Sequence, residues 1–127
     1  MELEEYFKKG RAYIWRETFA MVKAKKIDQE AFTNIVDKHE ITVIIDEEKL
    51  DEENVIEIMR GWKIFTLDIA FPPTFCGVTA RIADALAKEN ISIMPIAAFT
   101  RDHFVIAEKN MERAKAVFEG LGIRVSE

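Results

Sequence analysis

The strongest constraint on the fold is the alternation of strand and helix patterns over the second half of the chain. Residues 63–70 (KIFTLDIA) alternate side chains between two faces, as a strand does. Residues 78–90 repeat apolar side chains every four positions, as an amphipathic helix does. Further on, the sequence predicts strands over 91–99, 103–108 and 123–126, and a helix capped by Asn110. The order βαββαβ predicts an α+β fold, a ferredoxin-like sandwich.

Proline and asparagine residues support these assignments. Pro95 has no N–H to donate, so residues 91–99 fit an edge strand, and the second strand of this topology lies on an edge. Pro72 and Pro73 end the preceding strand. Asn90 is expected to end the first helix in the left-handed conformation. Residues 100–102 form a tight connection between two strands.

The first half of the chain gives a weaker pattern. Residues 1–10 are a short helix or an arm, 11–25 resemble a strand, and ITVII (41–45) is a buried strand. Residues 28–40 fit either a helix or a strand and a turn. Residues 50–59 (LDEENVIEIM) are expected to form a short helix capped by Asp51, with its apolar side chains inward and Gly61 at its end. Those inward side chains are Val55, Ile56 and Met59.

Composition excludes several functional classes. The formal net charge is −5, and seven acids against one lysine lie in residues 46–57, so nucleic acid is not expected as a partner. The single Cys76 excludes an intramolecular disulfide and a cysteine-based metal site, and no cofactor is implied. The sequence shows neither a signal peptide nor an apolar run of membrane-spanning length, which predicts a cytoplasmic protein without membrane contact.

Four segments together resemble the small-molecule-sensing ACT domain. They are Gly77 at the start of a helix, A-L-A-x-x-x-I-S-I (85–93), F-x-x-D-H-F-x-I (99–106) and E-R-A (112–114). The chain is most similar to the tandem-ACT proteins related to aspartate kinase regulatory domains and to the arginine-sensing CASTOR proteins. The resemblance covers residues 17–124. It implies two ACT-like half-repeats in one compact unit: a degenerate one over 11–61 and an ACT domain over 62–127.

The resemblance also implies a function and a site. Members of such families bind an amino acid or a similar metabolite between two ACT units, as regulatory modules without catalysis. A homodimer, or a regulated enzyme in trans, is the expected partner. The implied ligand-binding residues come from the loop before the first helix, from the second strand and from the following turn. They are Thr74, Phe75, Cys76, Gly77, Val78, Ile93, Met94, Ile96 and Asp102. The acid that ACT loops often carry before the glycine is absent here.

The chemistry of these residues fits a free amino acid. The N–H groups at the start of a helix suit a carboxylate, and Asp102 could pair with an ammonium or guanidinium group. A protein-interaction or oligomerisation module without a metabolite is the main alternative. Cys76 has no evident base beside it, and His103 is interpreted as structural. Phe75 lies either over the core or in the pocket, and the pocket is favoured slightly.

Overall fold

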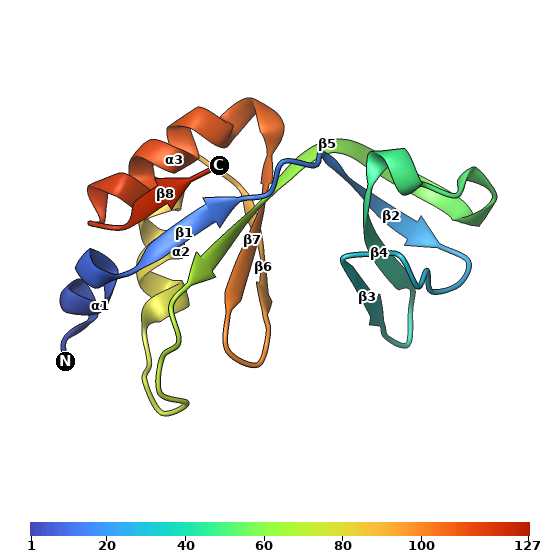
Figure 1. Ribbon diagram of the computed structural model, residues 1–127. Coiled ribbons are helices and arrows are strands. Elements are labelled where there is room, and N and C mark those ends of the chain that lie inside the picture. Colours follow the sequence, from blue (N-terminus) through green and yellow to red (C-terminus); the bar gives the residue numbers. More distant parts are fainter. The chain divides into compact units, whose positions relative to one another are not determined.

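The computed structural model describes all of residues 1–127, which divide into two compact units. The first unit consists of Met1–Arg16 and Lys63–Glu127, and the second of Glu17–Trp62. Strand β5 (Val55–Asp68) contributes its first half to the second unit and its second half to the first (Figure 1).

The first unit has the predicted βαββαβ series with one additional strand. The series is β5, α2 (Val78–Lys88), β6 (Ile93–Ala97), β7 (Asp102–Ala107), α3 (Met111–Gly120) and β8 (Arg124–Ser126), preceded by α1 (Leu3–Lys9) and β1 (Arg11–Ile14). The strand order is β6-β7-β5-β1-β8. Strand β1 therefore lies between the first and last strands of the series, antiparallel to β5 and parallel to β8. Strand β6 is at the edge, which confirms the interpretation of Pro95.

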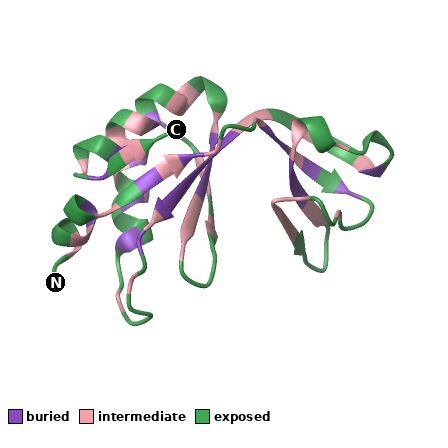
Figure 2. Cartoon of the chain, viewed as in Figure 1, coloured by how far each residue is buried: buried purple, intermediate pink, exposed green.

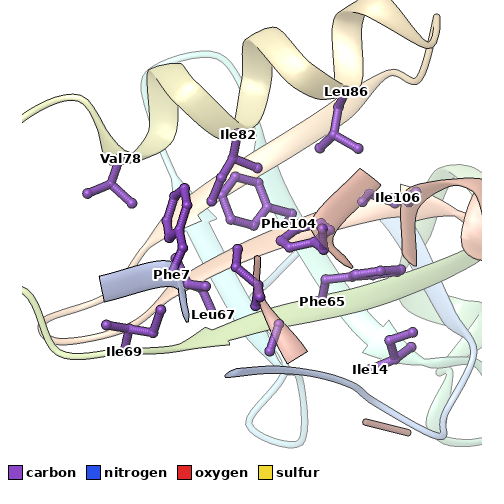
Figure 3. Close-up of a cluster of buried hydrophobic side chains, with 14 of the residues drawn as sticks. Phe7, Ile14, Phe65, Leu67, Ile69, Val78, Ile82, Leu86, Phe104 and Ile106 are labelled. Atoms are coloured by element: carbon purple, nitrogen blue, oxygen red, sulfur yellow. The ribbon is translucent and has the colours of Figure 1, made fainter. Parts of the chain in front are cut away.

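The helices of this unit pack on one face of its sheet through the apolar repeat read from the sequence (Figure 3). Val78, Ile82 and Leu86 of α2 are buried, at a spacing of four residues. They meet the sheet side chains Phe65, Leu67, Phe104 and Ile106, together with Phe118 of α3 and Phe7 of α1. Figure 2 shows that buried residues are concentrated on the strands in the middle of this sheet.

The predicted C-terminal end of α2 is confirmed, whereas the predicted cap at the start of α3 is not. Asn90 has φ 58°, in the left-handed region, and Ile91 N–H donates to the Leu86 carbonyl, so the predicted helix end is confirmed. Asn110 precedes α3 but makes no side-chain cap. A 3-10 turn (Glu108–Asn110) leads into the helix instead, and the Asn110 Oδ1 accepts a hydrogen bond from Arg113.

The second unit is a sheet without an α-helix. Its strands are β2 (Phe19–Ala24), β3 (Thr33–Val36), β4 (Ile41–Asp46) and the first half of β5, in the order β3-β4-β2-β5. Ala20, Val22, Ala24, Val43 and Ile45 form its core. Ala31 and Leu50, from the segments between strands, pack against that core.

The helix predicted over 50–59 is wrong. Two 3-10 turns (Glu47–Lys49 and Glu52–Asn54) lead directly into β5. Asp46 and Asp51 each accept a hydrogen bond from the N–H two residues later, which stabilises short turns. Residues 55–59 pair with β2, where β-branched side chains fit, and Ile56 and Met59 are 53% and 57% exposed instead of inward.

Two other segments of the first half are settled by strand pairing. Residues 28–40 contain β3 and a turn, the strand alternative, and in that turn Asp37 accepts hydrogen bonds from the N–H groups of His39 and Glu40. Residues 11–25 form two strands, β1 and β2, in different units. The predicted boundary at residue 62 lies beside the observed one, but residues 11–16 belong to the first unit because β1 pairs with β5 and β8.

Candidate functional site

A cavity of about 220 Å³ in the first unit is lined by the first turn of α2 and by the β6–β7 hairpin. Its lining residues are Thr79, Pro95, Ile96, Ala97, Asp102, His103 and Phe104. Of the residues implied by the resemblance, Ile96 and Asp102 line it directly, and Gly77 and Val78 lie within two residues of Thr79. The cavity thus combines the start of a helix, an edge strand and one carboxylate.

The start of α2 carries no side-chain cap. Gly77 is the N-cap residue with φ 95°, a conformation that favours glycine, and it makes no side-chain hydrogen bond. The first helical bond runs from Arg81 N–H to the Gly77 carbonyl at 2.9 Å. The N–H groups of the first turn therefore have no side-chain acceptor, and Thr79 of that turn lines the cavity. This arrangement suits the carboxylate of a ligand.

Asp102 begins β7 opposite Ala97 of β6, just after the turn closed by the hydrogen bond from Ala98 N–H to the Arg101 carbonyl. Its half-buried carboxylate accepts no hydrogen bond within the protein, and its charge acts on the neighbouring His103. Burial lowers the pKa of His103, and the charge of Asp102 opposes that shift only in part. His103 is therefore neutral at pH 7 and does not neutralise the charge of Asp102.

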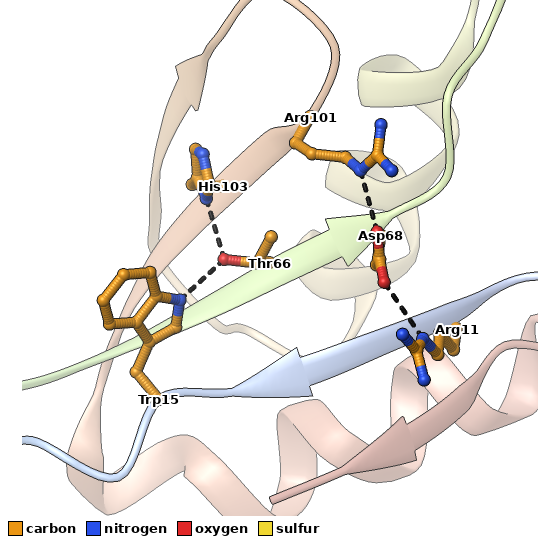
Figure 4. Close-up of polar contacts among 6 residues, drawn as sticks. All are labelled: Arg11, Trp15, Thr66, Asp68, Arg101 and His103. Carbon is orange, nitrogen blue, oxygen red and sulfur yellow. Dashed lines mark hydrogen bonds and ion pairs between the residues drawn. The ribbon is translucent and has the colours of Figure 1, made fainter.

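His103 is held by a short chain of hydrogen bonds on the sheet face away from the helices (Figure 4). The indole N–H of Trp15 donates to Thr66 Oγ1 at 2.8 Å, and the same oxygen lies 2.8 Å from His103 Nδ1. Since the indole only donates, the hydroxyl hydrogen of Thr66 is available for Nδ1, which suits the neutral ring. The structural role predicted for His103 matches this geometry, and the residue is also part of the cavity lining.

The remaining residues implied by the resemblance lie elsewhere. Phe75 packs on Tyr6 and Phe71, with ring centroids 5.1 and 5.5 Å away, over the core and outside the cavity. Val78 is buried in the core. Thr74 and Cys76 are exposed on the loop, and Ile93 and Met94 lie on β6 beyond the cavity lining.

Sequence reasoning missed five of the lining residues: Thr79, Pro95, Ala97, His103 and Phe104. The register of β6 and β7 brings four of them together, with Pro95 opposite Phe104 and Ala97 next to Asp102. That register follows from the four-residue turn between the strands, a signal present in residues 98–101. No group of three or more His, Cys, Asp or Glu side chains is placed to hold a metal ion. None of the α-helices combines the length and the hydrophobicity that a transmembrane helix requires.

Comparison with known proteins gives the family. Residues 57–119 match the model of the ACT domain family. No sequence among curated proteins matches the chain. A crystal structure of a protein from Agrobacterium tumefaciens is 15% identical, with a TM-score of 0.77 and 93% of each chain covered. A Vibrio cholerae protein, described as a possible transport protein, is 16% identical, with a TM-score of 0.76 and 94% and 95% covered.

The ligand-free regulatory subunit of aspartate kinase from Thermus thermophilus is 11% identical, with a TM-score of 0.68 and coverage of 91% of this chain and 97% of that subunit. At such low identities these structures show a shared fold. The family match itself runs from β5 to α3. Residues 57–119 are therefore an ACT domain, and the chain has the fold of aspartate kinase regulatory domains.

Proposed function

We propose that this protein is a regulatory module that senses a free amino acid in the cavity between α2 and the β6–β7 hairpin. ACT domains in general are small-ligand regulatory modules. The observation that carries the proposal is that one cavity holds both an uncapped helix start and a carboxylate without a hydrogen-bond partner, Asp102. The α-carboxylate of the ligand would meet the first turn of α2, and its ammonium group would meet Asp102.

The size and lining of the cavity favour a compact ligand. Its volume of about 220 Å³ is below the roughly 300–1,000 Å³ of sites for drug-sized molecules. Pro95, Ile96 and Phe104 provide apolar contacts for a side chain. The loop acid that often serves such sites is absent before Gly77, so Asp102 carries the recognition of the cation alone.

Calorimetric titration with the common amino acids, after a thermal-shift screen, tests this proposal. For the best ligand we expect Asp102→Asn to weaken binding by about tenfold or more, because a charge-assisted hydrogen bond is lost. Asp84→Asn is the matched control, since Asp84 pairs with Lys88 on the solvent side of α2 and should leave binding unchanged. The 2-oxo acid and the decarboxylated amine of the same ligand should each bind at least about tenfold more weakly. If no amino acid stabilises the protein, or if both variants bind equally, the proposal is wrong.

The partner of such a module would be a second copy of the chain or an enzyme regulated in trans. One observation favours the alternative of an interaction module that binds no metabolite. Phe99, at the tip of the β6–β7 hairpin, is fully exposed at 103%, and a large exposed aromatic side chain is typical of a contact surface. Light scattering after size exclusion separates the two. A dimer that Phe99→Ser dissociates, with no effect of any amino acid, would favour the interaction module.

A further inference from the structure

Three arginines gather on the sheet face that the helices of the first unit leave uncovered. Arg11 of β1 pairs in register with Asp68 of β5 on one side and with Arg124 of β8 on the other. Arg101, just before β7, reaches Asp68 from the far side of β5 (Figure 4). The adjacent residues Ala12, Leu67 and Val125 pack into the helix-covered core, so these charged side chains point to the opposite face. We call Arg11, Arg101 and Arg124 the arginine row.

Asp68 binds two of these arginines but occupies only one N–H donor of each. Its Oδ1 accepts a hydrogen bond from Arg101 Nε at 2.8 Å, and its Oδ2 accepts one from Arg11 Nε at 3.0 Å. Each arginine therefore binds Asp68 through Nε, and its terminal NH₂ groups have no acceptor in the protein. The two guanidinium groups hold the pKa of Asp68 below its usual value, so the carboxylate stays ionised at neutral pH. The side chain of Asp68 is 20% exposed, against 37% for Arg101 and 65% for Arg11.

Arg124 adds a charge that no acid balances. It lies directly beside Arg11 on the neighbouring strand, at the roughly 4.8 Å spacing of paired strands. Like charges in such cross-strand positions destabilise a sheet. The nearest acidic residue along the chain, Glu127, is bound by Lys115 at 3.1 Å. The row and Asp68 together thus carry a surplus of two positive charges.

The geometry points to a binding site for the phosphate group of a small phosphorylated molecule, and we propose that the arginine row is that site. A phosphate monoester carries nearly two negative charges at neutral pH, which matches the surplus, whereas a carboxylate would balance half of it. Planar guanidinium groups with free terminal N–H donors bind phosphate oxygens in pairs. Bound phosphate would also relieve the repulsion between Arg11 and Arg124.

The arginine row is separate from the amino-acid cavity, so either proposal can be refuted without the other. Arg101 and Asp102 are adjacent, but Asp102 lines the cavity while Arg101 reaches across to Asp68. Substitution of Asp102 therefore tests the cavity, and substitution of Arg124 tests the arginine row.

The experiment is calorimetric titration with inorganic phosphate and with AMP, at constant ionic strength set by sodium chloride. We expect the wild-type protein to bind at least one of the two at millimolar or lower concentration. Arg124→Gln should weaken that binding by about tenfold, because a charge-assisted contact is removed. Arg124 makes no hydrogen bond in the protein, so this variant should keep the fold, as circular dichroism would verify.

Two variants sharpen the result. Arg81→Gln removes the same charge from an exposed position on α2 and should change the dissociation constant by less than about twofold. Asp68→Asn removes the competing carboxylate and should keep or tighten phosphate binding, whereas a cation site would lose its ligand. Equal binding by wild type and Arg124→Gln, or no binding of either probe by the wild type, would overturn the proposal.

Discussion

Replacing Phe118 by alanine should be among the most destabilising single changes in the first unit. The side chain has 0% exposure, stacks on Phe65 at 5.3 Å between ring centroids, and meets Phe104 edge-on at 5.9 Å. Truncation of a buried phenylalanine costs about 3–5 kcal/mol. The loss of two aromatic contacts, each worth about 0.5–1.5 kcal/mol, favours the upper half of that range. We expect a loss of about 4 kcal/mol.

The same chain provides a matched control. Phe99 is fully exposed at the tip of the β6–β7 hairpin, so Phe99→Ala removes the same ring without leaving a cavity. Its effect on the free energy of unfolding should be within about 0.5 kcal/mol. All three α-helices belong to the first unit, so urea unfolding followed by far-UV circular dichroism at the helical band reports on that unit.

The comparison of the two variants can refute the packing argument. A loss of about 4 kcal/mol is a large part of the roughly 5–15 kcal/mol that stabilises a typical domain, so Phe118→Ala should shift the midpoint strongly. If Phe118→Ala and Phe99→Ala unfold at the same urea concentration, α3 is not packed on β5 and β7 as described.

Three further predictions concern backbone space and pH. A side chain at Gly10 would overlap Ile69 and lie 2.9 Å from the Tyr6 carbonyl, so Gly10→Ala should cost about 1–3 kcal/mol in urea unfolding. Hydrogen bonds from Arg101 and Arg11 lower the pKa of Asp68 below 3.8 in the folded protein. The ionised carboxylate therefore stabilises the fold above pH 3.8, and this stabilisation is lost as the pH falls through the pKa of the folded state. In Asp68→Asn, the free energy of unfolding should depend less on pH in this acidic range. Burial lowers the pKa of His103 below 6.5 in the folded protein, so the unfolded chain binds more protons near that pH. The free energy of unfolding should therefore decline as the pH falls through 6.5. Urea unfolding at a series of pH values should show a smaller decline for His103→Gln.

Local periodicity made the first unit predictable. Val78, Ile82 and Leu86 sit at the spacing of a buried helix face, and they are buried in the structure. Pro95 fixed the edge strand because a missing N–H excludes a central position. The end of the first helix at Asn90 was predictable from this residue alone, because asparagine tolerates the left-handed conformation.

The features that sequence reasoning missed depend on distant pairing. Residues 55–59 carry apolar side chains that fit a helix, but their pairing with β2 makes them a strand. The insertion of β1 between β5 and β8 follows from contacts between the two ends of the chain. The arginine row is assembled by the same insertion, since Arg11 and Arg124 become neighbours only through the register of β1 and β8.

The position of Arg101 explains why its guanidinium group does not pair with Asp102. A guanidinium group on the preceding residue would ordinarily pair with a free carboxylate nearby, which would remove the charge that an ammonium group needs. Here Arg101 is bound to Asp68 on the neighbouring strand at 2.8 Å, and the burial of His103 keeps that ring neutral. Neither Arg101 nor His103 therefore neutralises the charge of Asp102. The network on the open face of the sheet and the cavity lining share one residue, His103.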